Sequence, residues 1–175
     1  MHQRLFFILF FAIITMHHAV IYIGCKKNNV VSFNVVKNYL IASRIITLVM
    51  LYFWIKSFIL NPKTQRWMPT SNIGIFGVML IVFGQVLNLS AYCTLGVNGI
   101  YYGKEYGVVS NINYDSFPYS HFRDPQYTGC ILTLVGLLFY IMRETCDLYS
   151  IILIVYTIVL YMLTIEVEKN CNMAQ

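Results

Sequence analysis

Long apolar stretches that follow one another along the whole chain constrain its fold more than any other feature of the sequence. A helix needs about 20 largely apolar residues to cross the roughly 30 Å hydrocarbon core of a bilayer. Five stretches reach or approach that length: Leu5–Gly24, Leu40–Leu60, Ile73–Leu95, Tyr127–Met142 and Leu148–Ile165. Because backbone polar groups in lipid must be hydrogen-bonded within their own segment, these stretches predict membrane helices.

The composition agrees with this prediction. Hydrophobic residues make up 58% of the 175-residue chain and charged residues 11%, whereas a soluble domain carries about 25% charged residues. A soluble globular enzyme and a disordered chain are therefore both disfavoured. The net charge of +5 is too dispersed for a nucleic-acid surface. Five cysteines without a CxxC spacing predict neither a disulfide framework nor a metal site.

We predict a single all-α integral membrane domain over residues 1–175, with four to five transmembrane or re-entrant helices. The fourth stretch is short, so it forms either a tilted span or a re-entrant segment. Few residues separate it from the fifth stretch, which predicts a C-terminal helical hairpin over residues 126–165. Arg44 is expected to extend to a membrane interface. His17 and His18 are expected to face the helix bundle or the interface.

A long polar segment, residues 96–129, separates the third stretch from the body of the fourth. A loop of about 30 residues in so small a protein is either functional or disordered, and its Gly, Tyr and Asn content with scattered charges favours an ordered site. Counting membrane crossings places this segment on the same face as Glu166, Glu168 and the loop 25–39. That face carries more Lys and Arg than the opposite one, so the positive-inside rule predicts that it faces the cytosol.

Regularly spaced glycines open this segment. Gly99, Gly103 and Gly107 recur at every fourth residue, a spacing typical of closely packed membrane helices. The alternative is a close approach of the backbone to a cofactor, which only glycine permits. No strand–turn–helix pattern surrounds these glycines, so a Rossmann-type dinucleotide site is excluded.

Chemically versatile side chains cluster just before the fourth stretch and at its start. His121 offers a base that titrates near neutral pH, and Arg123 offers a cation able to grip a phosphate with two nitrogens. Asp124 offers a carboxylate, although Asp followed by Pro125 is also typical of a helix start. Tyr127 adds a phenol. These residue types together favour a reactive site over a plain connection.

Two carboxylates, Glu166 and Glu168, end the last apolar stretch. One interpretation is a solvated helix end. The other is a cationic partner, because carboxylates at the C-terminal end of a helix oppose the helix dipole, which favours cations there. Residues two apart on a helix point about 200° apart, so one of the two carboxylates is expected to face away from any common ligand.

Together these motifs resemble the phospholipid N-methyltransferase family, the phosphatidylethanolamine and phosphatidyl-N-methylethanolamine N-methyltransferases of the endoplasmic reticulum, to which the isoprenylcysteine carboxyl methyltransferases are related. The resemblance covers roughly Ile73–Lys169. It is carried, in order and spacing, by Leu95-Gly96 through Gly107, Phe117-Pro118-Tyr119, Asp124-Pro125-Gln126-Tyr127-Thr128-Gly129 and Glu166-Val167-Glu168. The chain departs from the family pattern at Ile100, where the family has Thr, and at Val167, which separates the two glutamates.

The resemblance implies S-adenosylmethionine as the cofactor. It implies methyl transfer to the amine of phosphatidylethanolamine or of its mono- and dimethyl forms, giving phosphatidylcholine. It places the chain in the endoplasmic reticulum membrane, with a phospholipid as its partner. The residues that it assigns to the cofactor are Gly96, Gly99 and Gly103, against the adenosyl or carboxylate part, and Glu166 and Glu168, at the amino group or sulfonium.

The lipid amine must be neutral to react, which requires a base or a desolvating pocket. Under this resemblance His121 is expected to accept the proton, with Asp124 and Tyr127 as the next candidates. Arg123 is expected to bind the substrate phosphate. Tyrosine faces can stabilise the growing positive charge, and the candidates are Tyr101, Tyr102, Tyr106 and Tyr119.

Three other functions are compatible with parts of the sequence. A prenylcysteine carboxyl methyltransferase would use the same cofactor site with a different acceptor. A sterol-type membrane reductase has some likeness at the C-terminal end. A non-enzymatic membrane scaffold explains the hydrophobicity and the glycines, but neither the motif 124–129 nor the late glutamates. The number of methylation steps and the oligomeric state stay open.

Overall fold

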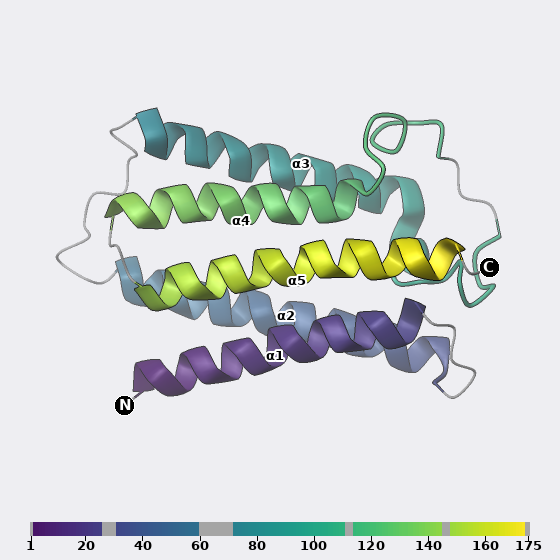
Figure 1. Ribbon diagram of the computed structural model, residues 1–175, viewed down its shortest axis with the longest axis horizontal. Coiled ribbons are helices and arrows are strands. Elements are labelled where there is room, and N and C mark those ends of the chain that lie inside the picture. The colour runs from purple at the N-terminus through teal and green to yellow at the C-terminus, as the bar shows by residue number, and fades with distance from the viewer. Residues whose placement is uncertain (1, 26–30, 60–71, 111–113, 145–147, 174–175) are drawn as a thin grey trace.

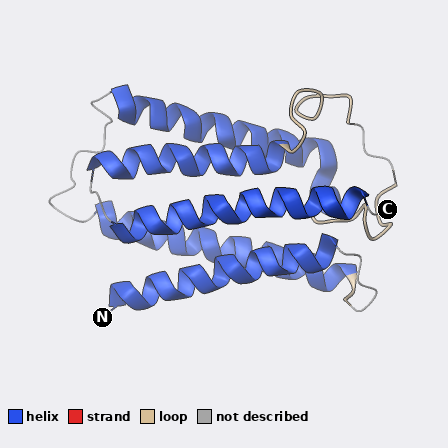
Figure 2. Ribbon diagram, viewed as in Figure 1, coloured by secondary structure: helices blue, strands red, loops and turns tan. Residues whose placement is uncertain are grey.

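The computed structural model describes residues 2–25, 31–59, 72–110, 114–144 and 148–173, and over these ranges it contains helices and turns but no strand. The helices are α1 (His2–Cys25), α2 (Phe33–Ile59), α3 (Asn72–Ile100), α4 (Pro125–Glu144) and α5 (Leu148–Met173). The predicted all-α fold is confirmed (Figure 2). By length and composition α1, α2, α3 and α5 can each cross a membrane, whereas the apolar part of α4 is shorter, Pro125–Ile141.

Two helices extend beyond the apolar stretches that predicted them. α2 begins at Phe33 rather than Leu40, and the carbonyl oxygen of Ser32 accepts hydrogen bonds of 3.1 and 3.2 Å from its first turn. α5 continues to Met173 rather than Ile165, so both late glutamates are still helical. Hydropathy detects the part of a helix that lies in hydrocarbon, whereas the backbone hydrogen bonds continue into the polar region.

The described helices run alongside one another as a single bundle (Figure 1). α3 and α4 form the closest pair, α4 and α1 each pack against α5, and α2 packs against α1. The packing therefore runs in the order α3, α4, α5, α1, α2, with α2 and α3 at its two margins. The turns after α3, the segment before α4 and the C-terminal part of α5 lie at one end of the bundle, opposite the N-terminus.

Glycines hold α3 and α4 together. A Cβ added to Gly84 would lie 2.5 Å from the carbonyl oxygen of Gly129, and one added to Gly77 would lie 2.8 Å from that of Gly136. Both distances are too short for a carbon and an oxygen, so only glycine lets the two backbones come this close. The pair α3–α4 is therefore the rigid side of the bundle, and it carries the connection that contains the predicted site.

A compact core joins α1, α2, the C-terminal part of α3 and the turns after it. Its buried residues are Ile21, Val36, Leu40, Ala91, Ile100, Tyr101 and Tyr102. The outside of the bundle is apolar, since Leu48 is 64% exposed and Leu89 is 67% exposed. An apolar exterior of this kind is the surface that lipid covers in a membrane. The core thus fixes the glycine-rich turns against the N-terminal helices.

Candidate active site

A break in α3 shapes this end of the bundle. Gly96 has φ 65° and ψ 171°, a backbone conformation that is essentially restricted to glycine. The last turns of α3 change direction there and bend across the end of the bundle (Figure 1). No atom of the described chain lies within 4 Å of a Cβ built on Gly96. The backbone at the break therefore borders open space.

Tight turns follow the bent helix and direct a tyrosine inward. The Gly103 N–H donates to the carbonyl oxygen of Asn98 at 2.8 Å, and a Cβ on Gly103 would lie 2.5 Å from that oxygen. Tyr102 has φ 66°, a conformation that costs a residue with a side chain about 1–3 kcal/mol. Gly103 and Gly107 lie in these turns and Gly99 lies in the last turn of α3. The interpretation of their spacing as helix packing is therefore wrong.

Two buried tyrosines converge on one carboxylate where α4 and α5 meet the turns. The Tyr102 hydroxyl donates to Oε1 of Glu168 at 2.5 Å, the Tyr127 hydroxyl donates to the same oxygen, and the two hydroxyl oxygens lie 3.0 Å apart. Burial, with Tyr127 and Glu168 close by, raises the pKa of Tyr102 well above its ordinary value. Its hydroxyl therefore stays protonated and donates. Hydroxyl–carboxylate hydrogen bonds are strong, so they fix the orientation of Glu168.

Two further carboxylates act electrostatically on Glu168. They belong to Asp124 and Glu105. Burial raises the pKa of Asp124 above its ordinary value, while the positive charges of Arg123 and Lys169 act in the opposite direction. A carboxylate held in place between two buried tyrosines, with two further carboxylates acting on it, favours a cation at that point.

The other late glutamate points elsewhere. The side chain of Glu166 is 63% exposed, and its Oε2 lies 3.1 Å from Nζ of Lys169. Two residues along an α-helix correspond to about 200° of rotation, which explains why Glu168 enters the cluster and Glu166 does not. The structure thus brings one glutamate of the pair together with Tyr127.

His121 and Arg123 lie at the rim of this end of the bundle. Both side chains are exposed. Nδ1 of His121 lies 2.8 Å from Oγ of Ser120, and the imidazole ring centre lies 6.2 Å from that of the Phe117 ring. The described contacts of His121 are therefore with its own segment rather than with the three carboxylates.

Arg44 of α2 turns its side chain into the bundle, against the turns after α3, and its extension to a membrane interface stays a prediction. Its Nη1 donates to the Tyr92 hydroxyl at 2.9 Å, and the hydroxyls of Tyr92 and Tyr101 lie 2.7 Å apart. The guanidinium carbon lies 5.2 Å from the ring centre of Tyr101, within the roughly 6 Å range of cation–π contacts. The signal in the sequence was an arginine within an apolar stretch, which is rare unless it has a function.

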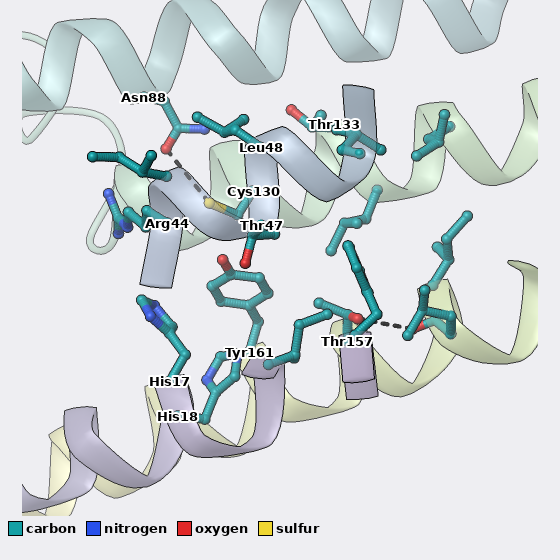
Figure 3. Close-up of a pocket in the computed structure, with 18 of the residues that line it drawn as sticks. His17, His18, Arg44, Thr47, Leu48, Asn88, Cys130, Thr133, Thr157 and Tyr161 are labelled. Atoms are coloured by element: carbon teal, nitrogen blue, oxygen red, sulfur yellow. Dashed lines mark hydrogen bonds between the residues drawn. The ribbon is translucent and has the colours of Figure 1, made fainter. Parts of the chain in front are cut away.

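A cavity of about 540 Å³ lies within the bundle beside Arg44. Figure 3 shows side chains from all five described helices around its polar part: His17, His18, Arg44, Asn88, Cys130 and Tyr161. The two histidines face the bundle, one of the two orientations predicted. His17 Nδ1 lies 2.6 Å from Ser43 Oγ, and His18 Nδ1 lies 2.8 Å from Thr164 Oγ1. Ligand pockets typically enclose about 300–1,000 Å³, so the cavity is large enough for a ligand.

The turns after α3 have features that fit a charged cofactor. The hydroxyl of Tyr106 is buried and has no hydrogen-bond partner within the described part of the chain, whereas buried polar groups are normally paired. The backbone at Gly96 borders open space, and the carboxylates of Glu105 and Asp124 act electrostatically on that of Glu168. This end of the molecule therefore offers a free hydroxyl and a negative region to a ligand that is polar and positively charged.

A model of the phospholipid methyltransferase family matches residues 73–172. The phosphatidyl-N-methylethanolamine N-methyltransferase of Arabidopsis thaliana is 40% identical over 73 residues, which cover 41% of this chain and 43% of the plant protein. The protein of the same name from Saccharomyces cerevisiae is 36% identical over 64 residues, or 37% of this chain and 31% of the yeast protein.

Phosphatidylethanolamine N-methyltransferase A of Dictyostelium discoideum is 28% identical over 100 residues, which cover 56% of this chain and 46% of that protein. The chain thus spans less than half of the length of these relatives. No solved structure matches the chain. The three carboxylates and both tyrosines of the cluster lie inside the matched range 73–172, and Arg44 lies outside it.

Proposed function

The chain belongs to the phospholipid methyltransferase family, and we propose that it transfers methyl groups from S-adenosylmethionine to the amine of phosphatidylethanolamine or of its mono- and dimethyl forms, giving phosphatidylcholine. The observation that carries the proposal is Glu168, held by hydrogen bonds from the buried hydroxyls of Tyr102 and Tyr127, with the carboxylates of Glu105 and Asp124 acting on it electrostatically. Both the methyl donor and the methylated amine are cations. A fixed negative site stabilises such charges.

The residues at this end fit S-adenosylmethionine. When bound, the cofactor supplies a methyl group on a positively charged sulfur. We assign Glu168 to its cationic groups, with Glu166 as the weaker candidate because it is exposed and paired. Gly96 borders open space where the adenosyl or carboxylate part would lie, together with Gly99. Gly103 contributes through the turn it forms, since the carbonyl oxygen of Asn98 fills the space beside it.

The lipid amine must lose a proton before it can attack. Asp124 is our first candidate for the acceptor, because its carboxylate lies near Glu168 and its raised pKa makes it a better base than an ordinary carboxylate. Tyr127 holds Glu168 in place from the other side. His121, at the exposed rim, is suited to pass the proton on to water. This order reverses the sequence-based preference for His121.

The position of the site suggests how it meets its surroundings. It lies at the end of the bundle where α5 ends, and Lys104, Arg123 and Lys169 lie at this end as well. By the positive-inside rule we propose that this end faces the cytosol, with the endoplasmic reticulum as the membrane. Arg123 is the candidate for the substrate phosphate that the sequence suggests. Arg44, inside the bundle, is a second candidate for the substrate phosphate.

The test is methyl transfer in liposomes. The purified protein is returned to vesicles that contain phosphatidylethanolamine, its monomethyl form or its dimethyl form, with labelled S-adenosylmethionine, and the product lipids are separated. Label in the methylated phospholipids is expected, and the preferred acceptor identifies the step. Cofactor binding without label in any lipid would point to a prenylcysteine acceptor. A folded protein that binds no S-adenosylmethionine would overturn the proposal.

A further inference from the structure

Arg44 is a cation without a countercharge. It lies partly buried in a helix that can cross a membrane. Among the described residues it forms no ion pair, and the groups that act on it most strongly are Tyr101, Tyr161 and Tyr92, none of which is a carboxylate. A charge in this position is costly unless something compensates it. The arrangement therefore calls for an anion that the described chain does not supply.

The lining of the cavity beside Arg44 is polar in one part and apolar in the rest. Its polar part contains Arg44 and Tyr101, while Leu51, Leu137 and Leu153 are among the apolar side chains that line the rest. Figure 3 shows His17, Asn88, Cys130 and Tyr161 on the side of Arg44, with Thr133 and Thr157 farther from it. A ligand that fills this space has one anionic group attached to a long apolar part.

The cavity opens sideways. Ile45 and Leu48 of α2 and Gln85 of α3 line it and are also exposed on the outside of the bundle. α2 and α3 meet through side chains near the site end, at the Arg44–Tyr92 hydrogen bond and in the core of Val36, Leu40, Ala91 and Ile100, and Ile45, Leu48 and Gln85 lie farther along the two helices. The opening between α2 and α3 therefore faces the apolar exterior, so a lipid can enter without leaving the membrane.

The polar part of the cavity adjoins the carboxylate cluster. Tyr101 stacks near Arg44, and the next residue, Tyr102, donates to Glu168. On the other side, Tyr161 lines the cavity and its ring centre lies 6.0 Å from that of Tyr127. In an ethanolamine phospholipid only an ethylene group separates the phosphate from the amine. Tyr101 and Tyr161 thus connect Arg44 with the two tyrosines that hold Glu168, and the amine of a lipid whose phosphate lies at Arg44 would point toward that side.

We propose that this cavity binds the phospholipid acceptor, with its phosphodiester at Arg44 and one acyl chain in the apolar part. The inference rests on the proposed function and deepens it. It assigns the phosphate to Arg44, inside the bundle, rather than to Arg123, whose side chain is exposed at the rim. The guanidinium can donate to two phosphate oxygens at once, and the hydroxyls of Tyr92 and Tyr101 lie beside it.

The test combines lipid binding with kinetics for matched variants. Binding of short-chain phosphatidylethanolamine to the full-length protein in detergent is compared with binding of a diacylglycerol of the same chain length and of glycerophosphoethanolamine, which has no acyl chains. Arg44→Gln is expected to weaken phosphatidylethanolamine binding and to raise the lipid KM by about ten- to a hundredfold, the range of a lost charge-assisted hydrogen bond. S-adenosylmethionine affinity should stay unchanged, which also reports correct folding.

Two matched controls separate the charge and the cavity from general damage. Lys56→Gln removes an exposed cation from the same helix and should leave lipid binding unchanged. Leu137→Trp fills the apolar part of the cavity, whereas Leu163→Trp adds the same bulk to a residue that is 58% exposed. Only the former should weaken binding. Arg44→Lys, which keeps the charge without the paired nitrogens, is expected to restore part of the affinity.

The outcomes distinguish this inference from the proposed function. Methyl transfer with normal lipid KM in both Arg44→Gln and Leu137→Trp would overturn the lipid site and leave the function standing. A raised lipid KM in Arg123→Gln but not in Arg44→Gln would also overturn it. Binding of phosphatidylethanolamine that depends on Arg44, without any methyl transfer, would support the lipid site while the proposed function fails.

Discussion

Glu166 and Glu168 have the same chemistry and nearly the same place in the chain, yet they stand in different surroundings. Glu168 accepts hydrogen bonds from two buried tyrosines, and Glu166 pairs with Lys169 at the surface. An exposed ion pair contributes about 0–1 kcal/mol, whereas a hydrogen bond to a charged group contributes about 1.5–3 kcal/mol. The two glutamates should therefore differ in what they give to cofactor binding.

We predict that Glu168→Gln weakens S-adenosylmethionine binding by about ten- to a hundredfold, because the variant loses one charged contact. Glu166→Gln, matched in chemistry and helix, should weaken it by less than about fivefold. Calorimetric titration of the detergent-purified protein measures both. Equal losses in the two variants would contradict the assignment of Glu168 to the cofactor.

Single residues could be predicted only in part. Tyr127 and Glu168 follow from motifs, and counting membrane crossings predicted correctly that the polar segment and the late glutamates share a face, as the bond between Tyr102 and Glu168 confirms. The sequence did not predict where the side chains of His121 and Arg44 lie, which is at the exposed rim for His121 and inside the bundle for Arg44. The direction of a side chain depends on how the backbone packs, and spacing in the sequence does not contain that information.

The close contact between α3 and α4 depends on glycines inside the two helices. The regularly spaced Gly103 and Gly107, which drew attention in the sequence, lie in turns after α3. Gly84 and Gly129 are buried where the two backbones meet, and their small size lets the helices approach closely. This pair of helices carries both ends of the segment that forms the site, so its packing determines whether Tyr102 and Tyr127 meet Glu168.

Enlarging Gly84 should therefore destabilise the protein. In Gly84→Ala the new Cβ would lie 2.5 Å from both the carbonyl oxygen of Gly129 and Oγ1 of Thr133. Overpacking of this kind costs about 1–3 kcal/mol, and we expect a lower Tm by circular dichroism in detergent. Val82→Leu, on the exposed side of the same helix, is the control and should leave the Tm unchanged. A Tm of Gly84→Ala equal to that of the unmodified protein would show that α3 and α4 are not this close.

The helices themselves could be predicted well, because long apolar stretches in lipid leave the backbone few alternatives. All five predicted stretches correspond to described helices. The fourth stretch is expected to be a tilted span or a re-entrant segment. It forms a helix of 20 residues that runs along α3. Helix ends were predicted less well, since α2 and α5 extend into polar sequence.

The molecule as a whole has two unlike ends. The candidate site, the segment before α4 and the end of α5 lie at one end, and the start of α3 and the N-terminus lie at the other. The polar segment and the late glutamates should then be accessible from the same side of a membrane. This arrangement follows from the number of crossings alone and does not depend on the activity.

Cysteine labelling in sealed microsomes tests this arrangement. Lys104→Cys and Ser120→Cys, both exposed at the site end, should react with an impermeant maleimide from the same side, above the level of the unmodified protein. Asn72→Cys, exposed at the start of α3, should react only after the vesicles are opened, or the reverse if the vesicles have the other orientation. Labelling of all three from one side would contradict the crossing of α3.

The family likeness covers the molecule unevenly. The matched residues 73–172 contain α3, α4 and most of α5, which together with the turns provide the carboxylate cluster. α1 and α2 lie outside the match, and they supply His17, His18 and Arg44 to the cavity. The motifs in the sequence therefore point to the end that carries the proposed cofactor site, whereas the proposed lipid cavity could be recognised only once the helices were placed in space.

If the cavity binds the lipid acceptor as proposed, access to it between α2 and α3 means that the two reactants of the proposed reaction reach one centre from different phases. The donor would arrive from water at the exposed turns, and the acceptor would arrive by diffusion within the membrane. Because the routes of the methyl donor and the lipid acceptor do not overlap, the donor that has lost its methyl group could be exchanged while the lipid stays in the cavity. We expect the enzyme to respond to the mole fraction of acceptor in its own leaflet, and to add successive methyl groups within a single lipid encounter.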